Sequence, residues 1–95
     1  MANILIVDDE RPIRSTLKDI LEYEKIKVEE AENGQKAIEL FKKKEFDAVL
    51  CDIKMPGMDG TQVLAKIKEM DQVSEVIMIT GHAGVETAIE ALKGG

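Results

Sequence analysis

The chain has 95 residues, which is the length of one domain, and its 44% apolar and 34% charged residues are typical of a globular protein rather than a disordered or fibrous one. A formal net charge of −6, one tyrosine, two phenylalanines and no tryptophan argue against nucleic-acid binding by this segment, because such binding needs clustered cations and stacking platforms. The apolar runs are too short to cross a bilayer and the single cysteine cannot form an internal disulfide, so we expect no membrane partner and a cytoplasmic location.

The first half of the chain alternates strand and helix patterns. Residues 4–7 are continuously apolar, which indicates a strand buried on both faces of a parallel sheet. Pro12 suits the first turn of a helix whose apolar face extends to residue 21. Residues 27–31 predict a weak, peripheral strand, and Asn33 predicts the N-cap of a second helix with its apolar face at residues 37–41.

The second half repeats the alternation. Residues 46–51 predict a buried strand, and a loop rich in proline and glycine separates it from a third helix around residues 63–67. Residues 75–80 predict a fourth strand, and residues 85–92 predict a fourth helix. Four alternating units with short connections predict an α/β fold, in which a parallel sheet is covered by helices on both faces through right-handed crossovers.

Polar residues stand where three of these strands end: Asp8 and Asp9, Asp52, and Thr80. Parallel sheets of this kind place their sites at the carboxyl ends of the strands. If the first and third strands are neighbours, three carboxylates converge, and a cation is needed to make that concentration of negative charge tolerable. Oxygen ligands at a shallow site that retains several waters favour Mg²⁺.

With these residues in place, the sequence resembles the receiver domains of two-component response regulators. The resemblance extends over residues 1–95 and rests on the segments "ILIVDDE", "DIKMPGMDG" and "MITGHAGVETAIEALKGG". It implies a flavodoxin-like, doubly wound parallel sheet with strand order 2-1-3-4. It also implies a role in phosphorelay signalling that controls an output such as transcription, and the last segment is most similar to receivers of sigma-54-dependent transcription activators.

The resemblance implies a role for each site residue. Asp52 is expected to accept a phosphoryl group from the phosphohistidine of a sensor histidine kinase. Asp9 is expected to bind Mg²⁺ directly, Asp8 through water, and Lys54 through its main-chain carbonyl. The hydroxyl of Thr80 is expected to contact the phosphoryl group and to switch the surface around the fourth strand and helix.

Mg²⁺ suits this chemistry because a carboxylate is a poor nucleophile toward a negatively charged phosphoryl group. The loop after the acceptor should support the site. Pro56 and Gly57 are expected to direct a backbone N–H and a carbonyl toward it, and Gly60 is expected to adopt backbone angles that other residues resist.

The family pattern has a fifth strand–helix unit that carries a lysine of the site, and residues 1–95 contain only four units. We therefore expect an incomplete receiver domain and a truncated sheet in which the fifth strand is absent. Residues 76–79 would then form an unpaired edge, which favours self-association or exchange of an element between copies. We expect weak Mg²⁺ binding, little durable phosphorylation, and contact with DNA only through an absent effector domain.

Two rival functions share part of this pattern. A Mg²⁺-dependent hydrolase that forms an aspartyl-phosphate would need a second carboxylate soon after the nucleophile, and the residue two positions past Asp52 is Lys54. A receiver-like module could also serve protein contacts alone, but it would not need Asp8, Asp9 and Thr80 beside Asp52. We therefore expect a phosphoacceptor and switch rather than an enzyme.

Overall fold

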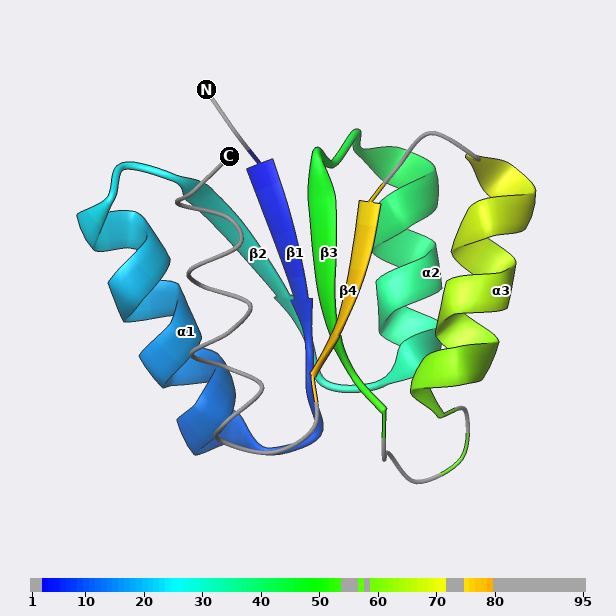
Figure 1. Cartoon of the computed structure of the whole chain (residues 1–95), viewed down its shortest axis with the longest axis horizontal. Helices are drawn as coiled ribbons and strands as arrows, with labels where there is room; N and C mark the ends of the chain where they lie inside the picture. Colours follow the sequence, from blue (N-terminus) through cyan, green and yellow to red (C-terminus); the bar gives the residue numbers. More distant parts are fainter. Residues whose placement is uncertain (1–2, 54–56, 58, 72–74, 80–95) are drawn as a thin grey trace.

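The computed structural model describes residues 3–53, 57, 59–71 and 75–79 (Figure 1). Strands and helices alternate as predicted, in the order β1 (Asn3–Val7), α1 (Arg11–Tyr23), β2 (Lys27–Ala31), α2 (Gly34–Lys43), β3 (Ala48–Asp52), α3 (Gly60–Met70) and β4 (Glu75–Ile79). The helix predicted over residues 85–92 lies outside the described residues. None of the helices in the described ranges is long and apolar enough to span a membrane.

The four strands form one parallel sheet in the order β2-β1-β3-β4, which confirms the predicted order. β1 lies between β2 and β3, with Val7 in register with Ala31 on one side and with Cys51 on the other. β2 is an edge strand, as its weak apolar pattern predicted. Because all four strands are parallel, their carboxyl ends lie along the same edge of the sheet (Figure 1).

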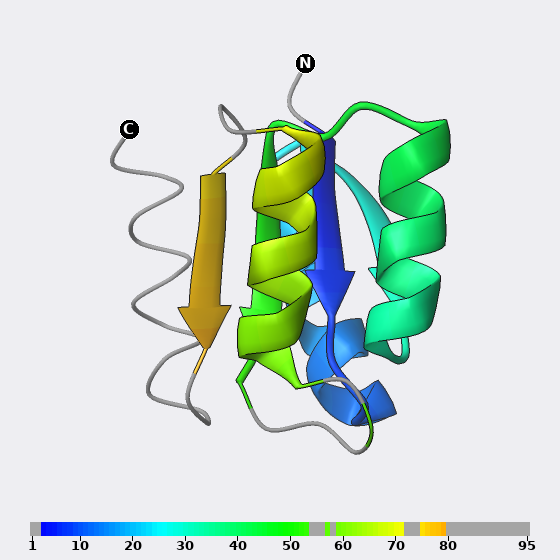
Figure 2. The ribbon, with the colours of Figure 1, turned by 90° about the vertical axis from the view of Figure 1, so that its right-hand side faces the viewer.

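Helices cover both faces of the sheet, as the alternation of elements predicted. α1 lies on one face, and α2 and α3 lie side by side on the other (Figures 1 and 2). Successive residues of a strand point to opposite faces, so β1 serves two separate cores. Ile4 and Ile6 pack with Leu17 and Leu21 of α1. Leu5 and Val7 pack in a second core, which includes Ala37 of α2 together with Val63 and Ile67 of α3.

The helix starts follow local capping rules. Pro12 lies in the first turn of α1, as predicted. Asn33 caps α2, as predicted, because its side chain accepts a hydrogen bond from the N–H of Lys36 at 2.8 Å. Asp59 caps α3 in a reciprocal arrangement with Gln62, in which each side chain accepts a hydrogen bond from the other residue's backbone N–H, at 3.0 and 2.9 Å.

Two details of the sequence prediction are wrong. β3 begins at Ala48 rather than at residue 46, because Phe46 is buried against the helical layer instead, with its ring 6.2 Å from that of Phe41. The backbone at Gly60 is not in the left-handed region, since Gly60 is the first helical residue after the Asp59 cap. The positive φ in this region is at Gly57, where φ is 77°.

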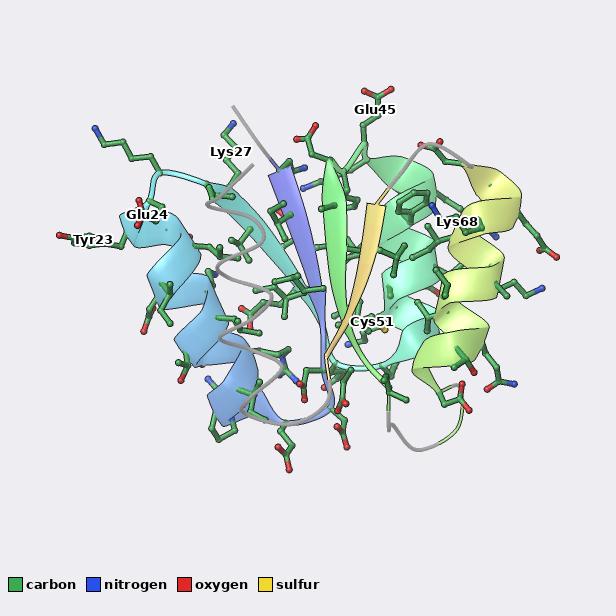
Figure 3. The ribbon with its side chains drawn as sticks, in the orientation of Figure 1. Tyr23, Glu24, Lys27, Glu45, Cys51 and Lys68 are labelled. Atoms are coloured by element: carbon green, nitrogen blue, oxygen red, sulfur yellow. The ribbon has the colours of Figure 1, made fainter. Side chains whose placement is uncertain are left out.

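Side-chain exposure matches the packing of helices on both faces of the sheet. Cys51 is buried between the sheet and the layer formed by α2 and α3, whereas Tyr23 points outward at the end of α1 and is 87% exposed (Figure 3). The buried side chains of β1 and β3 are apolar up to the carboxyl edge of these strands, and the first buried charged residue in chain order is Asp8.

Candidate metal-binding and phosphoacceptor site

Three carboxylates meet at the carboxyl ends of β1 and β3. Asp8 and Asp9 directly follow β1, and Asp52 is the last residue of β3. Because Val7 and Cys51 are in register, the chain leaves both strands at the same level. One carboxylate oxygen from each of the three residues lies within 4.8 Å of the other two. The prediction that Asp8, Asp9 and Asp52 lie close together is therefore confirmed.

The backbone and side chain of Asp8 are held by three neighbours. Its N–H donates to the carbonyl of Ala31 in β2 at 3.1 Å, which extends the β1–β2 ladder by one residue. Its Oδ1 accepts the N–H of Glu10 at 2.8 Å. Its main-chain carbonyl accepts a hydrogen bond from Nη1 of Arg14 at 2.6 Å. The position of this residue is therefore fixed from the strand, from the loop and from α1.

The site concentrates negative charge in a partly buried place. Asp8 is 2% exposed, Asp52 is half-buried and Asp9 is exposed. The pKa of Asp8 is raised to about 6, mainly by burial and also by the charges of Asp52 and Asp9, against the opposing hydrogen bond from Glu10. A proton or a cation would relieve this repulsion.

The donor set fits a hard divalent cation. Every candidate ligand atom in the cluster is a carboxylate oxygen, and oxygen ligands are those that Mg²⁺ prefers. The exposed carboxylate of Asp9 leaves an outer side open to water, which suits an ion that retains part of its hydration shell.

Cys51 precedes Asp52 but does not extend the candidate ligand set. Burial raises the pKa of its thiol to about 12, and the nearby charges of Asp52 and Asp8 act in the same direction. The thiol therefore stays protonated at neutral pH, and it donates to the main-chain carbonyl of Asp52 at 3.4 Å. This residue is a small buried apolar group next to Asp52.

The segment after Asp52 is tied back toward the strand end. The N–H of Gly60, at the start of α3, donates to the carbonyl of Ile53 at 2.9 Å. Between them, Gly57 has a positive φ. The expected main-chain ligand at Lys54, the loop residue Pro56 and the expected phosphoryl contact at Thr80 lie outside the described residues.

The sequence analysis missed Arg14. Its side chain is 12% exposed, and besides the bond to Asp8 its Nε lies 3.4 Å from Oε1 of Glu30. The partner atom at the site is a main-chain carbonyl, which leaves no mark in the residue pattern. The available signal was positional: Arg14 follows the acidic loop at the first turn of α1 and lies next to the apolar face that begins at Ile13.

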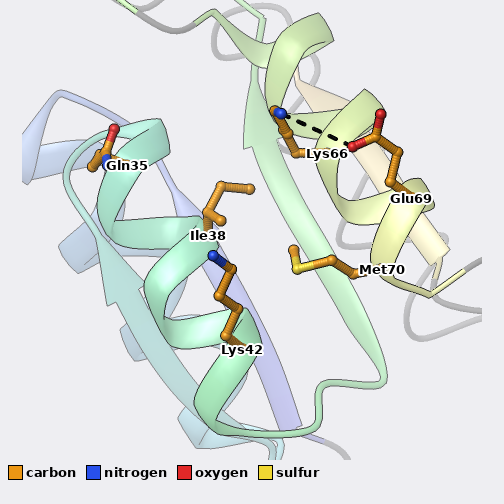
Figure 4. Close-up of a pocket in the computed structure, with 6 residues that line it drawn as sticks. All are labelled: Gln35, Ile38, Lys42, Lys66, Glu69 and Met70. Atoms are coloured by element: carbon orange, nitrogen blue, oxygen red, sulfur yellow. Dashed lines mark ion pairs between the residues drawn. The ribbon is translucent and has the colours of Figure 1, made fainter.

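A separate cavity of about 300 Å³ lies between α2 and α3 (Figure 4). Ile38 and Met70 form its apolar part, and the ion pair between Lys66 and Glu69, at 3.9 Å, lies at its side. Its lining does not include the three carboxylates, so it is distinct from the candidate metal site.

Comparison with known sequences identifies a family. The model of the response regulator receiver domain matches residues 4–95. The transcriptional regulatory protein ZraR of Klebsiella oxytoca is 41% identical, over 98% of this chain and 21% of its own length. The chemotaxis protein CheY of Halobacterium salinarum is 40% identical, over 97% of this chain and 77% of its own length. The chain therefore spans about a fifth of one relative and most of another.

Comparison with solved structures agrees. The response regulator protein TrrA from Thermotoga maritima, in complex with Mg(2+)-BeF, superposes with a TM-score of 0.83 at 34% identity, covering 97% of this chain and 80% of that chain. A complex of histidine kinase ThkA with TrrA gives a TM-score of 0.80 at 38% identity, covering 85% of this chain and 70% of that chain. The flavodoxin-like receiver fold predicted from the sequence is thus confirmed.

Proposed function

The chain belongs to the response regulator receiver domain family, and we propose that it accepts a phosphoryl group on Asp52 from a sensor histidine kinase. The observation that supports this function most directly is the convergence of Asp8, Asp9 and Asp52 at the ends of β1 and β3. Asp52, the acceptor proposed from the sequence, is the last residue of the interior strand β3 and is half-buried.

The proposed reaction is an in-line transfer to a carboxylate. An oxygen of Asp52 attacks phosphorus, a new O–P bond forms, and the N–P bond of the phosphohistidine breaks with its electron pair left on the histidine nitrogen. Bound Mg²⁺ supplies charge neutralisation between the carboxylate and the phosphoryl oxygens. The chain holds the acceptor at a strand end and holds Asp8 through main-chain contacts, so that little reorganisation is needed.

In this proposal Asp9 binds Mg²⁺ directly and Asp8 binds it through a water. The exposure of Asp9 and the burial of Asp8 support that division, because an ion approaching from the open side of the cluster would reach the carboxylate of Asp9 first. For Lys54, as a main-chain ligand, and for Thr80, as the phosphoryl contact and switch, the proposal rests on the resemblance of their sequence positions to those of the family.

The proposed partner is a sensor histidine kinase, and the proposed output is control of transcription. One support is the relative TrrA, which forms a complex with histidine kinase ThkA; the match to that complex has 38% identity over 85% of this chain. Another support is that the relatives ZraR and SrrA are transcriptional regulatory proteins, and that the segment similar to this chain makes up 21% of ZraR and 38% of SrrA. The free, buried thiol of Cys51 fits the proposed cytoplasmic location.

We propose that the chain is a phosphoryl acceptor and switch rather than an enzyme. The rival hydrolase needs a second acid–base carboxylate two residues after the nucleophile, and Lys54 stands there in the sequence. The family match favours the acceptor over that hydrolase.

Phosphorylation by a small donor tests the proposal. The 95-residue chain is incubated with acetyl phosphate and Mg²⁺, quenched at successive times, and analysed by intact-mass and peptide-mapping mass spectrometry. We expect a partial, short-lived phosphoryl adduct on Asp52 alone, which forms only with Mg²⁺ and is absent in Asp52→Asn.

Asp47→Asn is the matched control, because it removes a carboxylate from the opposite end of β3, where Asp47 accepts the N–H of Asn3 at 2.7 Å. This variant should be modified like the wild-type chain if it remains folded by circular dichroism. An adduct that persists in Asp52→Asn, or that forms equally with excess chelator, would contradict the proposed acceptor chemistry.

A further inference from the structure

Arg14 connects the beginning of α1 to the end of β1. Its Nη1 donates to the main-chain carbonyl of Asp8 at 2.6 Å, and its side chain is 12% exposed. A hydrogen bond from a charged guanidinium is roughly twice as strong as one between neutral groups, and the low exposure reduces competition from water. The contact therefore restrains the loop that follows the strand.

β2 holds this arginine in place. Oε1 of Glu30 lies 3.4 Å from Nε of Arg14, and Oε2 of the same carboxylate lies 3.5 Å from Nζ of Lys18, one turn further along α1. Glu30 is in register with Ile6 of β1, two residues before Asp8. One carboxylate on the neighbouring strand thus orients two cations of α1.

The restrained carbonyl determines where the next carboxylate goes. The carbonyl of Asp8 belongs to the planar peptide unit that joins the Cα atoms of Asp8 and Asp9. Fixing the direction of that carbonyl fixes the orientation of the plane, and hence the point from which the side chain of Asp9 leaves the backbone. The N–H of Asp8 is already held by Ala31, so the two contacts together fix residue 8 from both sides.

We propose that Arg14, oriented by Glu30, is a positioning residue for the metal site: it places Asp9 for Mg²⁺ by holding the peptide unit between Asp8 and Asp9. This inference rests on the proposed function, because it concerns the same ion. It predicts that removing Arg14 weakens Mg²⁺ binding, which is opposite to the effect expected from charge alone. A cation near a Mg²⁺ site repels the ion, so charge alone would make removal of Arg14 strengthen Mg²⁺ binding.

The test is a Mg²⁺ titration of the 95-residue chain, followed by amide chemical shifts, which needs no phosphorylation. In Arg14→Met, which retains an apolar stem, and in Arg14→Lys, which retains the charge, we expect Mg²⁺ affinity to fall about tenfold, as for other residues that orient metal ligands. Glu30→Gln should weaken binding about threefold, because that ion pair is partly exposed. Adding Glu30→Gln to Arg14→Met should cause little further loss.

Arg11→Met is the matched control. Arg11 is an exposed cation at the first residue of α1, so its removal reports the charge effect alone, and we expect unchanged or slightly tighter binding. The amide resonances of Asp9 and Glu10 should also shift in the metal-free Arg14 variants while those of β3 stay in place, which separates loop reorientation from unfolding. The acetyl phosphate reaction should need more Mg²⁺ in these variants but reach the wild-type rate at saturating Mg²⁺.

Two results would overturn the positioning role. Wild-type or tighter Mg²⁺ binding in both Arg14 variants, with binding still lost in Asp9→Asn, would contradict the inference and leave the proposed function intact. A wild-type chain that binds no Mg²⁺ sensitive to Asp9→Asn would contradict both.

Discussion

Asp8 and Asp52 lie at the ends of adjacent strands, and the charge of Asp52 adds to the effect of burial in raising the pKa of Asp8 to about 6. Both carboxylates belong to the cluster whose oxygens lie within 4.8 Å of one another. When no cation is bound, the ionised carboxylate of Asp8 therefore lowers the stability of the folded chain.

Removing that charge should stabilise the metal-free chain. The rise of the Asp8 pKa from 3.8 to about 6 corresponds to about 3 kcal/mol, and we expect about 1–2 kcal/mol because water screens charges at this edge of the sheet. Asp8→Asn should raise the unfolding free energy by this amount in urea denaturation at pH 7.5 with chelator, and should weaken Mg²⁺ binding. Asp19→Asn, in an exposed part of α1, is the charge-matched control and should change stability by under about 0.5 kcal/mol.

The same pKa predicts a pH dependence. The folded chain holds the Asp8 proton more tightly than the unfolded chain does, so this group's contribution to stability is most favourable below pH 4 and declines as pH rises toward 6 and above. Other carboxylates titrate in the same range, so the relevant quantity is the difference in unfolding free energy between wild-type and Asp8→Asn, measured from pH 4 to pH 8 with chelator. This difference should grow through pH 4–6 and then level off, and a difference independent of pH would contradict the burial argument.

Mg²⁺ should compete with that proton. In a titration series we expect the half-saturating Mg²⁺ concentration to increase as pH falls through about 6, because protonated Asp8 neither attracts the ion nor orients its water. Amide shifts of Asp9 provide the measurement. Equal affinity at pH 5 and pH 7.5 would show that Asp8 does not contribute to binding.

Much of the fold was predictable because the two buried faces of β1 and β3 leave an unbroken apolar pattern, and because parallel strands bring their carboxyl ends to one edge. That reasoning brought Asp8, Asp9 and Asp52 together correctly. It failed where the decisive contact involves the backbone. Gly57 rather than Gly60 has the positive φ, since the Asp59 cap had already begun a helix at residue 60.

The same limit applies to Arg14 and to the start of β3. Arg14 binds a main-chain carbonyl, and any residue at position 8 would provide that acceptor, so no pairing of residue types indicates the contact. Phe46 is apolar and precedes a strand, and only its packing on Phe41 shows that it belongs to the helical layer.

The core beneath β3 should be sensitive to truncation of its side chains. Ile67 of α3 is fully buried in the same core as Val49 and Cys51 of β3. Ile67→Ala should cost about 2–5 kcal/mol, the range for removing a large aliphatic side chain from a packed interior. Met70, one turn later and 40% exposed, is the control, and Met70→Ala should cost under about 1 kcal/mol in the same urea denaturation. Equal losses for the two variants would contradict the assignment of the core.

The cap of α3 should matter for the segment that follows Asp52. Asp59 accepts hydrogen bonds from the hydroxyl of Thr61 at 2.6 Å and from the N–H of Gln62 at 3.0 Å, and these bonds lower its pKa below 3.8, with the Thr61 hydroxyl as the larger cause. Because the pKa of Asp59 is lower in the folded chain, its stabilising contribution is present above the unfolded-state pKa and is lost as pH falls through the folded-state pKa.

Asp59→Ala should lower the thermal unfolding midpoint at pH 7, whereas Asp59→Asn should retain most of the cap, since an amide oxygen also accepts the N–H of Gln62. The amide of Gly60, which binds the carbonyl of Ile53 just after Asp52, should exchange with solvent faster in Asp59→Ala. Unchanged exchange at Gly60 in a destabilised Asp59→Ala variant would show that the cap supports the helix without restraining the segment beside Asp52.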